Sequence, residues 1–96
     1  MSSIDIQVGR FVWNAEKDRL NKDRHAIGFR HARRAFEDPK RLIAVDPLHS
    51  QTEERFYGVG KVQRRILTIR FTYRGELIRM IGAGFWRRGK RLYEER

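Results

Sequence analysis

The sequence feature that most constrains the fold is a pair of alternating segments, residues 65–73 and 77–83, joined by Arg74-Gly75-Glu76. Apolar and polar side chains alternate in both segments, which is typical of β-strands with one buried face. A two-residue connection that contains glycine joins such strands into an antiparallel hairpin. We therefore expect a hairpin that turns at Gly75 and Glu76.

The turn also determines which side chains share a face, because it pairs Arg74 with Leu77. Counting back from this pair predicts an apolar face that belongs to the core, made of Leu67, Ile69, Phe71, Tyr73, Ile78 and Met80. The other face is expected to carry Thr68, Arg70, Thr72, Arg79, Ile81 and Ala83. In this register Ile69 lies opposite Gly82, and Arg70 stands diagonally from Arg79, so that one phosphate can bind both guanidinium groups. An ordinary solvated face of a sheet is the alternative interpretation.

The rest of the chain shows helix and strand signals around this hairpin. Asn14 is a good helix N-cap, and Asp38-Pro39 ends a segment with helical spacing of apolar residues. The expected helices span about 15–24, 29–37 and 85–95, and the further strands span 11–13, 42–45 and 55–60. Residues 1–8 and the last three are expected to fray. The 96 residues thus predict one domain, 1–96, with a small α+β fold: two N-terminal helices and a C-terminal helix packed on an antiparallel β-sheet, the first two covering its apolar face.

The charge of the chain points to an anionic partner. Lys and Arg number 22 against 12 Asp and Glu, which gives a net charge of +10, and arginine outnumbers lysine. A guanidinium group binds phosphate bidentately and stacks on bases, so nucleic acid is the first partner to expect. An acidic protein partner, or a charge that serves only solubility, is the alternative.

Other compositional features exclude several classes of function. The chain has no cysteine, which excludes disulfides, thiolate metal sites and a cysteine nucleophile. It has no apolar run near the ~20 residues that cross a bilayer, and no targeting segment at its start. We therefore expect a cytoplasmic protein that contacts no membrane.

A series of short motifs runs through residues 11–95 in a characteristic order and spacing. They are Phe11-x-Trp13-Asn14, Asn21-x-x-x-His25, Phe29-x-x-Ala32-x-x-x-Phe36-x-Asp38-Pro39, Asp46-x-x-His49-Ser50-x-x-x-Glu54-Arg55, Gly60 and Ile78-Arg79-x-Ile81-x-Ala83. Together they resemble the BrnT toxins of bacterial type II toxin–antitoxin systems. Two positions depart from that family's pattern: its usual His-Gly is His25-Ala26, and its usual Ile-Ser-Ala-Arg is Ile-Gly-Ala-Gly at 81–84.

The resemblance implies both a fold and a function. It implies a fold similar to RelE-type ribonuclease toxins, and an endoribonuclease activity that cleaves RNA and arrests growth. It also implies neutralisation by a BrnA-like antitoxin with a ribbon-helix-helix fold, in a toxin–antitoxin heterotetramer that binds operator DNA. No cofactor is expected.

Metal-independent RNA cleavage needs cations for the phosphorane charge and groups that move protons. The candidate cations are Arg79, Arg70 and Arg55, and the candidate proton carriers are His49 and Tyr93, with Glu54 as a weaker base. The basic terminal segment offers an RNA-binding set made of Trp86, Arg87, Arg88, Lys90 and Arg91. No Asp/Glu cluster with metal-ligand spacing is evident apart from Glu53-Glu54, so no metal site is expected.

Each candidate also has a structural interpretation. His49 can organise its loop, Tyr93 can belong to the core, and Glu54 can form an ion pair with Arg55. Trp86 can anchor the terminal helix or meet a protein partner instead of stacking on a base. The sequence therefore leaves two functions open: a ribonuclease toxin, or a basic module that binds nucleic acid or docks an antitoxin without catalysis. An antitoxin is expected to cover the basic sheet face and hide Arg70, Arg79 and Arg87.

Overall fold

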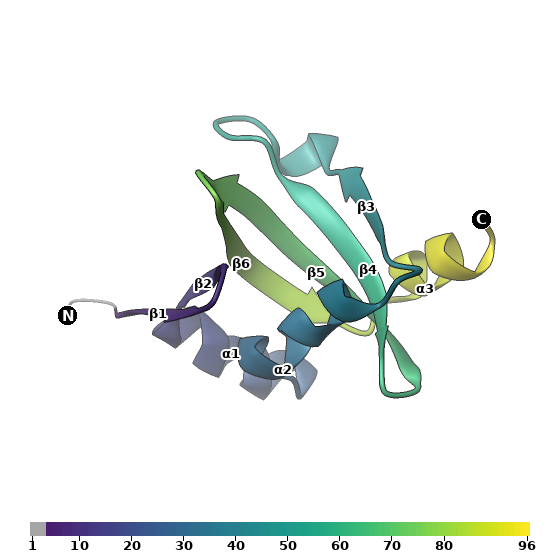
Figure 1. Ribbon diagram of the computed structural model, residues 1–96, viewed down its shortest axis with the longest axis horizontal. Coiled ribbons are helices and arrows are strands. Elements are labelled where there is room, and N and C mark those ends of the chain that lie inside the picture. The colour runs from purple at the N-terminus through teal and green to yellow at the C-terminus, as the bar shows by residue number, and fades with distance from the viewer. Residues whose placement is uncertain (1–3) are drawn as a thin grey trace.

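A six-stranded sheet forms the centre of the computed structural model, which describes residues 4–96 (Figure 1). In chain order the strands are β1 (Asp5–Val8), β2 (Phe11–Asn14), β3 (Leu42–Val45), β4 (Phe56–Val62), β5 (Arg65–Arg74) and β6 (Leu77–Gly84). They lie side by side in the order β1-β2-β6-β5-β4-β3. Residues 5–8, which were expected to fray, pair with β2, and residues 1–3 lie outside the described part of the chain.

The sheet is mixed, so the prediction of an antiparallel sheet was wrong at one place. Strand β2 runs parallel to β6, while the other neighbouring strands are antiparallel. Parallel neighbours need a long connection rather than a hairpin. Here more than sixty residues separate β2 from β6, a distance in the chain over which no hairpin signal can act.

The three helices were predicted nearly in place, but the second one differs in kind. They are α1 (Ala15–His25), α2 (Phe29–Ala32) and α3 (Arg87–Glu94), with the 3₁₀ segments η1 (Arg33–Glu37) and η2 (Pro47–His49). The expected single helix 29–37 is therefore a short α-helix that tightens into η1. There the backbone of Ala35 approaches β4 so closely that a Cβ on Gly60 would meet the Ala35 carbonyl oxygen. A side chain at position 60 would exclude this contact.

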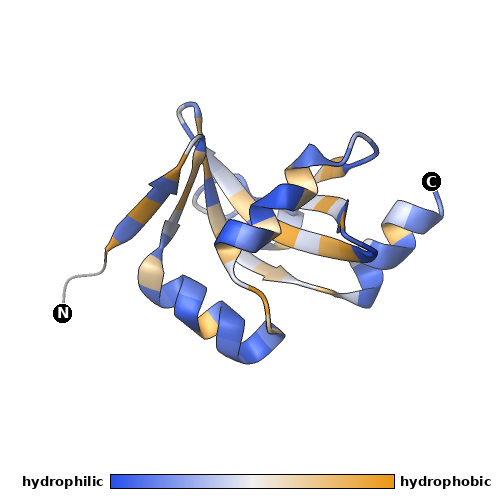
Figure 2. Ribbon diagram, turned by 60° about the horizontal axis from the view of Figure 1, so that its bottom comes forward, coloured by the Kyte–Doolittle hydropathy of each residue, from blue (hydrophilic) through white to orange (hydrophobic). Residues whose placement is uncertain are grey.

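The core lies between the sheet and the first helices, as predicted. Leu67, Ile69, Phe71 and Met80 are at most 1% exposed and pack in one cluster with Phe29, Ala32 and Ala35. Helix α1 itself is largely hydrophilic (Figure 2) and owes its place to polar contacts. The Asn14 side chain accepts a hydrogen bond from Lys17 N at its start, which confirms the predicted N-cap.

A bulge in β6 changes the predicted register of the hairpin. Tyr73 pairs with Ile78 and Phe71 with Met80, as predicted, but beyond the bulge Ile69 pairs with Ala83 instead of Gly82. A bulge adds one residue to one strand, which moves the following side chains to the other face. Ala83 is therefore buried in the core, contrary to the prediction, and Gly82 faces Arg70.

The buried side chain of Asn21 fixes β6 just past this bulge. Its amide nitrogen donates to the carbonyl oxygens of Ile27 and Ala83, and its amide oxygen accepts from Ala83 N at 3.1 Å. The side chain thus replaces a neighbouring strand for Ala83 and ties α1 to the sheet.

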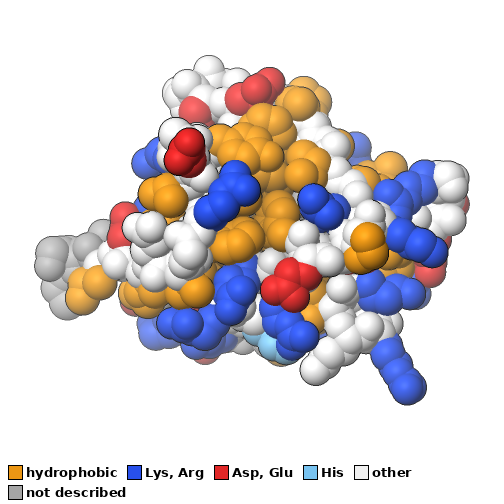
Figure 3. Space-filling model, in the orientation of Figure 1, with side chains coloured by type: hydrophobic (Ala, Val, Ile, Leu, Met, Phe, Trp, Pro, Cys, Tyr) orange, Lys and Arg blue, Asp and Glu red, His pale blue; other side chains and the backbone are white. Residues whose placement is uncertain are grey.

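Apolar side chains stay exposed on the helix side of the sheet, beyond the area that the helices cover. Ile43, Val45 and Tyr73 are between 44% and 48% exposed. Tyr73 was expected in the core, which was wrong, because it lies near the end of β5 beyond the helices. Figure 3 shows hydrophobic side chains gathered at the centre of this face, with Lys and Arg side chains around them.

Candidate active site

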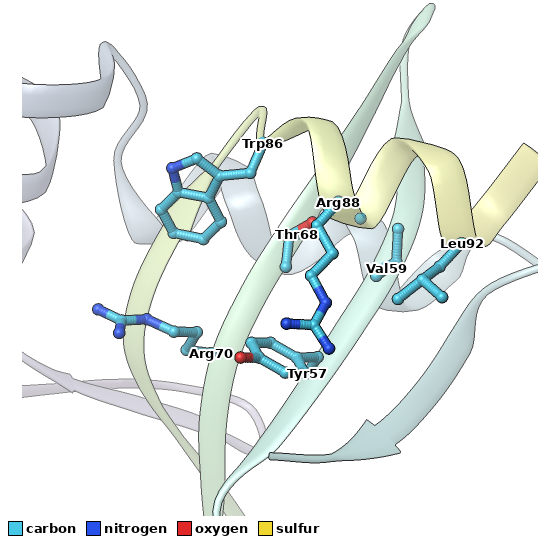
Figure 4. Close-up of a pocket in the computed structure, with 8 residues that line it drawn as sticks. Tyr57, Val59, Thr68, Arg70, Trp86, Arg88 and Leu92 are labelled. Atoms are coloured by element: carbon cyan, nitrogen blue, oxygen red, sulfur yellow. The ribbon is translucent and has the colours of Figure 1, made fainter. Parts of the chain in front are cut away.

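The face of the sheet opposite the core holds a cleft of about 300 Å³ beside α3 (Figure 4). Strands β4 and β5 form its floor, and the start of α3 with the residue before it forms one side. The side chains that line it are those of Tyr57, Val59, Thr68, Arg70, Trp86, Arg88 and Leu92. Helix α3 therefore packs on the open face, which the sequence had assigned to no helix.

Three glycines make room for the groups that line this cleft. A Cβ on Gly89 would lie 1.8 Å from Thr68 Oγ1, so only glycine lets α3 approach β5 this closely. A Cβ on Gly84 would lie 2.6 Å from the Trp86 ring, and one on Gly82 would lie 3.0 Å from Arg70 Nη2. The indole thus covers Gly84, where the BrnT pattern usually has arginine, and the guanidinium of Arg70 covers Gly82.

The bulge in β6 has a direct consequence for Arg70. Without it, Ile81 would face Arg70 across the hairpin; with it, Gly82 does. The Arg70 guanidinium lies over this glycine and 5.8 Å from the centre of the Trp86 ring, within the range of a cation–π interaction. The irregularity of β6 therefore builds part of the site.

Two polar atoms of the cleft are buried without a hydrogen-bond partner in the described chain. They are Arg70 Nε and Thr68 Oγ1. Within residues 4–96, neither Arg70 nor Arg88 has a carboxylate oxygen within 4.0 Å. Buried polar groups usually have partners, and groups that lack them are often found at functional sites. An anionic ligand in the cleft would pair these cations.

An aspartate–histidine pair lies next to the cleft and meets it through Tyr57. His49 Nδ1 is 2.7 Å from Asp46 Oδ2. Burial alone would raise the pKa of Asp46, but hydrogen bonds from His49 and Tyr57 hold the pKa below its ordinary value. Burial, with the nearby Asp46 charge, raises the pKa of Tyr57, while Arg88 and Arg70 oppose that rise. Tyr57 therefore stays protonated at neutral pH, beside a carboxylate that stays ionised.

The loop that carries His49 is held by a network of hydrogen bonds. Ser50 Oγ donates to Asp46 O at 2.6 Å and accepts from Arg55 N at 2.8 Å, and Asp46 N donates to Arg55 O. The backbone of Arg55 thus fixes the loop. Its guanidinium lies 3.1 Å from Glu53 Oε2, so the ion pair expected with Glu54 forms with Glu53 instead.

Two other predicted catalytic residues have partners elsewhere. Arg79 lies on the same face as Arg70 and pairs with Thr72, as predicted, but its guanidinium binds both carboxylate oxygens of Asp5, at 3.0 and 3.2 Å. The hydroxyl of Tyr93 donates to Asp38 Oδ2 at 2.6 Å. Neither residue lines the cleft.

The predicted RNA-binding residues are divided by Trp86. Arg88 lies in the cleft with Trp86, while Arg87 and Lys90 line a second hollow on the other side of the indole, and Arg91 is exposed outside both. Tyr57 was not among the site residues predicted from the sequence. Tyr57 on β4 pairs with Arg70 on β5. If the register of the β4–β5 hairpin had been known, the position of Tyr57 beside Arg70 would have followed from it. The turn at Gln63 and Arg64 could not be predicted from the sequence, because Gln63 adopts a positive φ of 57° although it is not glycine.

Within the described residues, no group of three or more His, Asp or Glu side chains is arranged to hold a metal ion. The helices of residues 4–96 are all too short or too polar to cross a membrane.

Comparison with known families now defines the class of protein. Residues 13–89 match the family model described as a ribonuclease toxin, BrnT, of a type II toxin–antitoxin system. The match covers most of the chain, and it identifies a ribonuclease toxin whose family acts on RNA and has an antitoxin partner. The chain belongs to the BrnT family, as the motifs predicted. Among curated proteins no relative matches the chain.

Proposed function

We propose that this chain is the toxin of a type II system and cleaves RNA in the cleft without a metal ion. The observation that carries the proposal is the pair of guanidinium groups, those of Arg70 and Arg88, that share the cleft with a protonated phenol and have no carboxylate partner within residues 4–96. The apolar side chains that line the cleft strengthen the field of the Arg70 charge, because Arg70 is partly buried and water screens it less.

In this mechanism the 2′-hydroxyl of the substrate attacks the adjacent phosphorus. The O2′–P bond forms, the P–O5′ bond breaks, and the products are a 2′,3′-cyclic phosphate and a 5′-hydroxyl. Arg70 and Arg88 bind the non-bridging oxygens, whose charge grows in the transition state. These two cations take the place that a metal ion has in other nucleases.

Two proton transfers accompany the attack. His49 accepts the proton of the 2′-hydroxyl as general base, and Asp46 orients its imidazole and stabilises the imidazolium that forms. Tyr57 donates a proton to the leaving 5′-oxygen, a role that its raised pKa permits at neutral pH. Tyr57 replaces Tyr93 in this role, because Tyr57 lines the cleft and Tyr93 does not.

The other predicted catalytic arginines support the site from outside. Arg55 holds the loop of Asp46 and His49 through its backbone. Arg79 fixes β6 to β1 through Asp5, near the strand segment that leads to Gly82. Trp86 stacks on a base of the substrate at the mouth of the cleft.

The partner in this proposal is a BrnA-like antitoxin with a ribbon-helix-helix domain, in a cytoplasmic heterotetramer that also binds operator DNA. Membership of the BrnT family supports this assignment. Co-expression with the antitoxin encoded beside the toxin gene is expected to restore growth and to yield a stable complex.

The test of the cleavage mechanism compares the wild type with an Arg70→Gln, Arg88→Gln variant on total RNA in the presence of EDTA. The wild type is expected to cleave in EDTA and to leave 2′,3′-cyclic phosphate ends. The variant, shown folded by circular dichroism, is expected to lose at least 100-fold in rate, about the effect of removing one charge-stabilising donor. Binding of RNA without cleavage by the wild type would support the non-catalytic module instead. Cleavage that EDTA abolishes would reject the metal-independent mechanism.

A further inference from the structure

A second hollow lies on the other side of Trp86 from the cleft. It has a volume of about 430 Å³, and cations dominate its lining. We call it the basic groove; its charged lining consists of Lys61, Arg64, Arg65, Arg87 and Lys90, with Glu94 as the acidic member. Trp86 lines both hollows, so the indole is the wall between them.

Two separate parts of the chain build the basic groove. Lys61 and Arg64 come from the end of β4 and its turn into β5, and Arg87 and Lys90 come from the first turn of α3. Figure 1 places α3 and this turn on the same side of the molecule, and Figure 3 shows several Lys and Arg side chains there. The packing of α3 on β5 through Gly89 brings the two parts together.

The five cations of the basic groove share it with one carboxylate, that of Glu94. Within residues 4–96, none of the five has a carboxylate oxygen within 4.0 Å, so the Glu94 carboxylate is not paired with any of them. The Arg65 guanidinium lies 3.5 Å from the centre of the Phe85 ring, which fixes its position. Five cations gathered around a single carboxylate fit a polyanion with regularly spaced charges.

We propose that the basic groove binds the phosphate backbone of single-stranded RNA on one side of the scissile bond, while Trp86 separates the strand in the groove from the nucleotide in the cleft. This inference rests on the proposed function, since it assigns the cleft to RNA. A base that stacks on Trp86 must be unpaired, because a duplex keeps its bases stacked on each other. The substrate is thus a single strand that is long enough to reach across the indole.

The test uses 2′-O-methyl RNA, which binds but cannot be cleaved, as a trinucleotide and as a 12-nucleotide strand of randomised sequence. The groove variant is Lys61→Gln, Arg64→Gln, and the control is Lys17→Gln, Arg30→Gln; all four side chains are exposed, and the control removes the same charge from α1 and α2. Affinity is measured against salt concentration. Loss of two phosphate contacts to a single strand should lower the log–log slope by about 1.4.

For the groove variant we expect this change in slope and about tenfold weaker binding of the 12-nucleotide strand, with unchanged binding of the trinucleotide. The control should match the wild type, and a 12-base-pair RNA duplex should bind the wild type more weakly than the single strand does. A groove variant that matches the control, or a duplex that binds equally well, overturns the inference. The first of these outcomes would make an acidic protein segment the better occupant. Because these ligands are not cleaved, a failure of the proposed catalysis leaves this measurement intact.

Discussion

The cleft and the basic groove share Trp86 as a wall, but they differ in what surrounds their charges. In the cleft, two guanidinium groups lie beside Val59, Leu92 and the indole; that of Arg70 is partly buried and that of Arg88 is exposed. In the basic groove, five exposed cations line one open surface. A partly buried charge such as that of Arg70 stabilises a transition state more strongly, because water screens it less. Many solvated charges instead give affinity for a long polyanion, with little demand on geometry.

The largest expected effect is a difference in the rate of RNA cleavage between substitutions of two arginines on the open face, Arg70 and Arg79. Arg70→Ala should lower the rate of RNA cleavage by two to three orders of magnitude, or about 3–4 kcal/mol, on short and long substrates alike. Arg79→Ala should lower it much less, because the Arg79 guanidinium is already bound by Asp5. Single-turnover rates of the folded variants measure both.

Equal losses in the two variants would return Arg79 to the catalytic role that the sequence predicts for it. Arg70→Lys should recover part of the rate, because lysine keeps the charge but loses the planar fork of donors.

The next effect concerns the wall between the two regions. Trp86→Ala should weaken binding of single-stranded RNA by about tenfold, since stacking of one base contributes about 1–3 kcal/mol. Trp86→Phe should lose less, because it keeps an aromatic face. Fluorescence anisotropy of labelled RNA measures both. If Trp86→Ala binds RNA as the wild type does, the indole serves only to anchor α3.

The third effect is on stability and tests the role of Asp46 in the loop beside the cleft. Asp46→Asn should lower the free energy of unfolding by about 2 kcal/mol at neutral pH, because buried hydrogen bonds to a charged group are lost. The pKa of Asp46 is lowered in the folded state. Its contribution is therefore complete above the ordinary aspartate pKa of about 3.9 and is lost as the pH falls through the lowered folded-state value.

Urea denaturation of the wild type and Asp46→Asn between pH 7 and pH 2 measures this prediction. The difference in unfolding free energy between the two proteins should begin to shrink below about pH 4 and should vanish below the lowered folded-state pKa of Asp46. A difference that does not depend on pH would mean that the Asp46 charge contributes nothing to the loop.

The smallest expected effect is on stability alone and should change neither the cleft nor the basic groove. Ala26 ends α1 with φ of 59°, in the left-handed region, at a position where the BrnT pattern usually has glycine. Ala26→Gly should stabilise the protein by about 1 kcal/mol, because glycine adopts this conformation without strain. The melting temperature measures the gain, and RNA cleavage should not change. A lower melting temperature would show that the entropy of glycine in the unfolded chain outweighs the strain.

The hairpin shows how far the sequence leads toward the site. Alternation and the turn at Gly75 predicted the core face through Leu67, Ile69 and Phe71, and all three are buried. The same count placed Ala83 on the open face, which was wrong, because no local pattern marks the bulge in β6. The bulge is stabilised by Asn21, sixty-two residues away along the chain.

The candidate site was predicted in part for the same reason. Arg70, Arg88 and Trp86 were selected for their type, and the structure brings them together in the cleft. Tyr57 was missed because its place beside Arg70 depends on the β4–β5 register, and the turn at Gln63 carries no glycine or asparagine signal. Lys61 and Arg64 were missed because only the docking of α3 places them next to Arg87.

The sequence by itself determined the charge, the family, most of the core face of the hairpin and the order of the helices and of strands β2 to β6. These properties depend on composition and on contacts between neighbours in the chain, which periodicity and turn residues report. Only the tertiary structure decided which arginines are free and which are paired. Asp5 lies 74 residues from Arg79 in the chain and binds it, while Arg70 lies over Gly82 and has no carboxylate oxygen within 4.0 Å in residues 4–96. Electrostatic pairing depends on distances in space. Asp5 reaches Arg79 only because β1 pairs with β2 and β2 pairs with β6, and these pairings form only in the folded sheet.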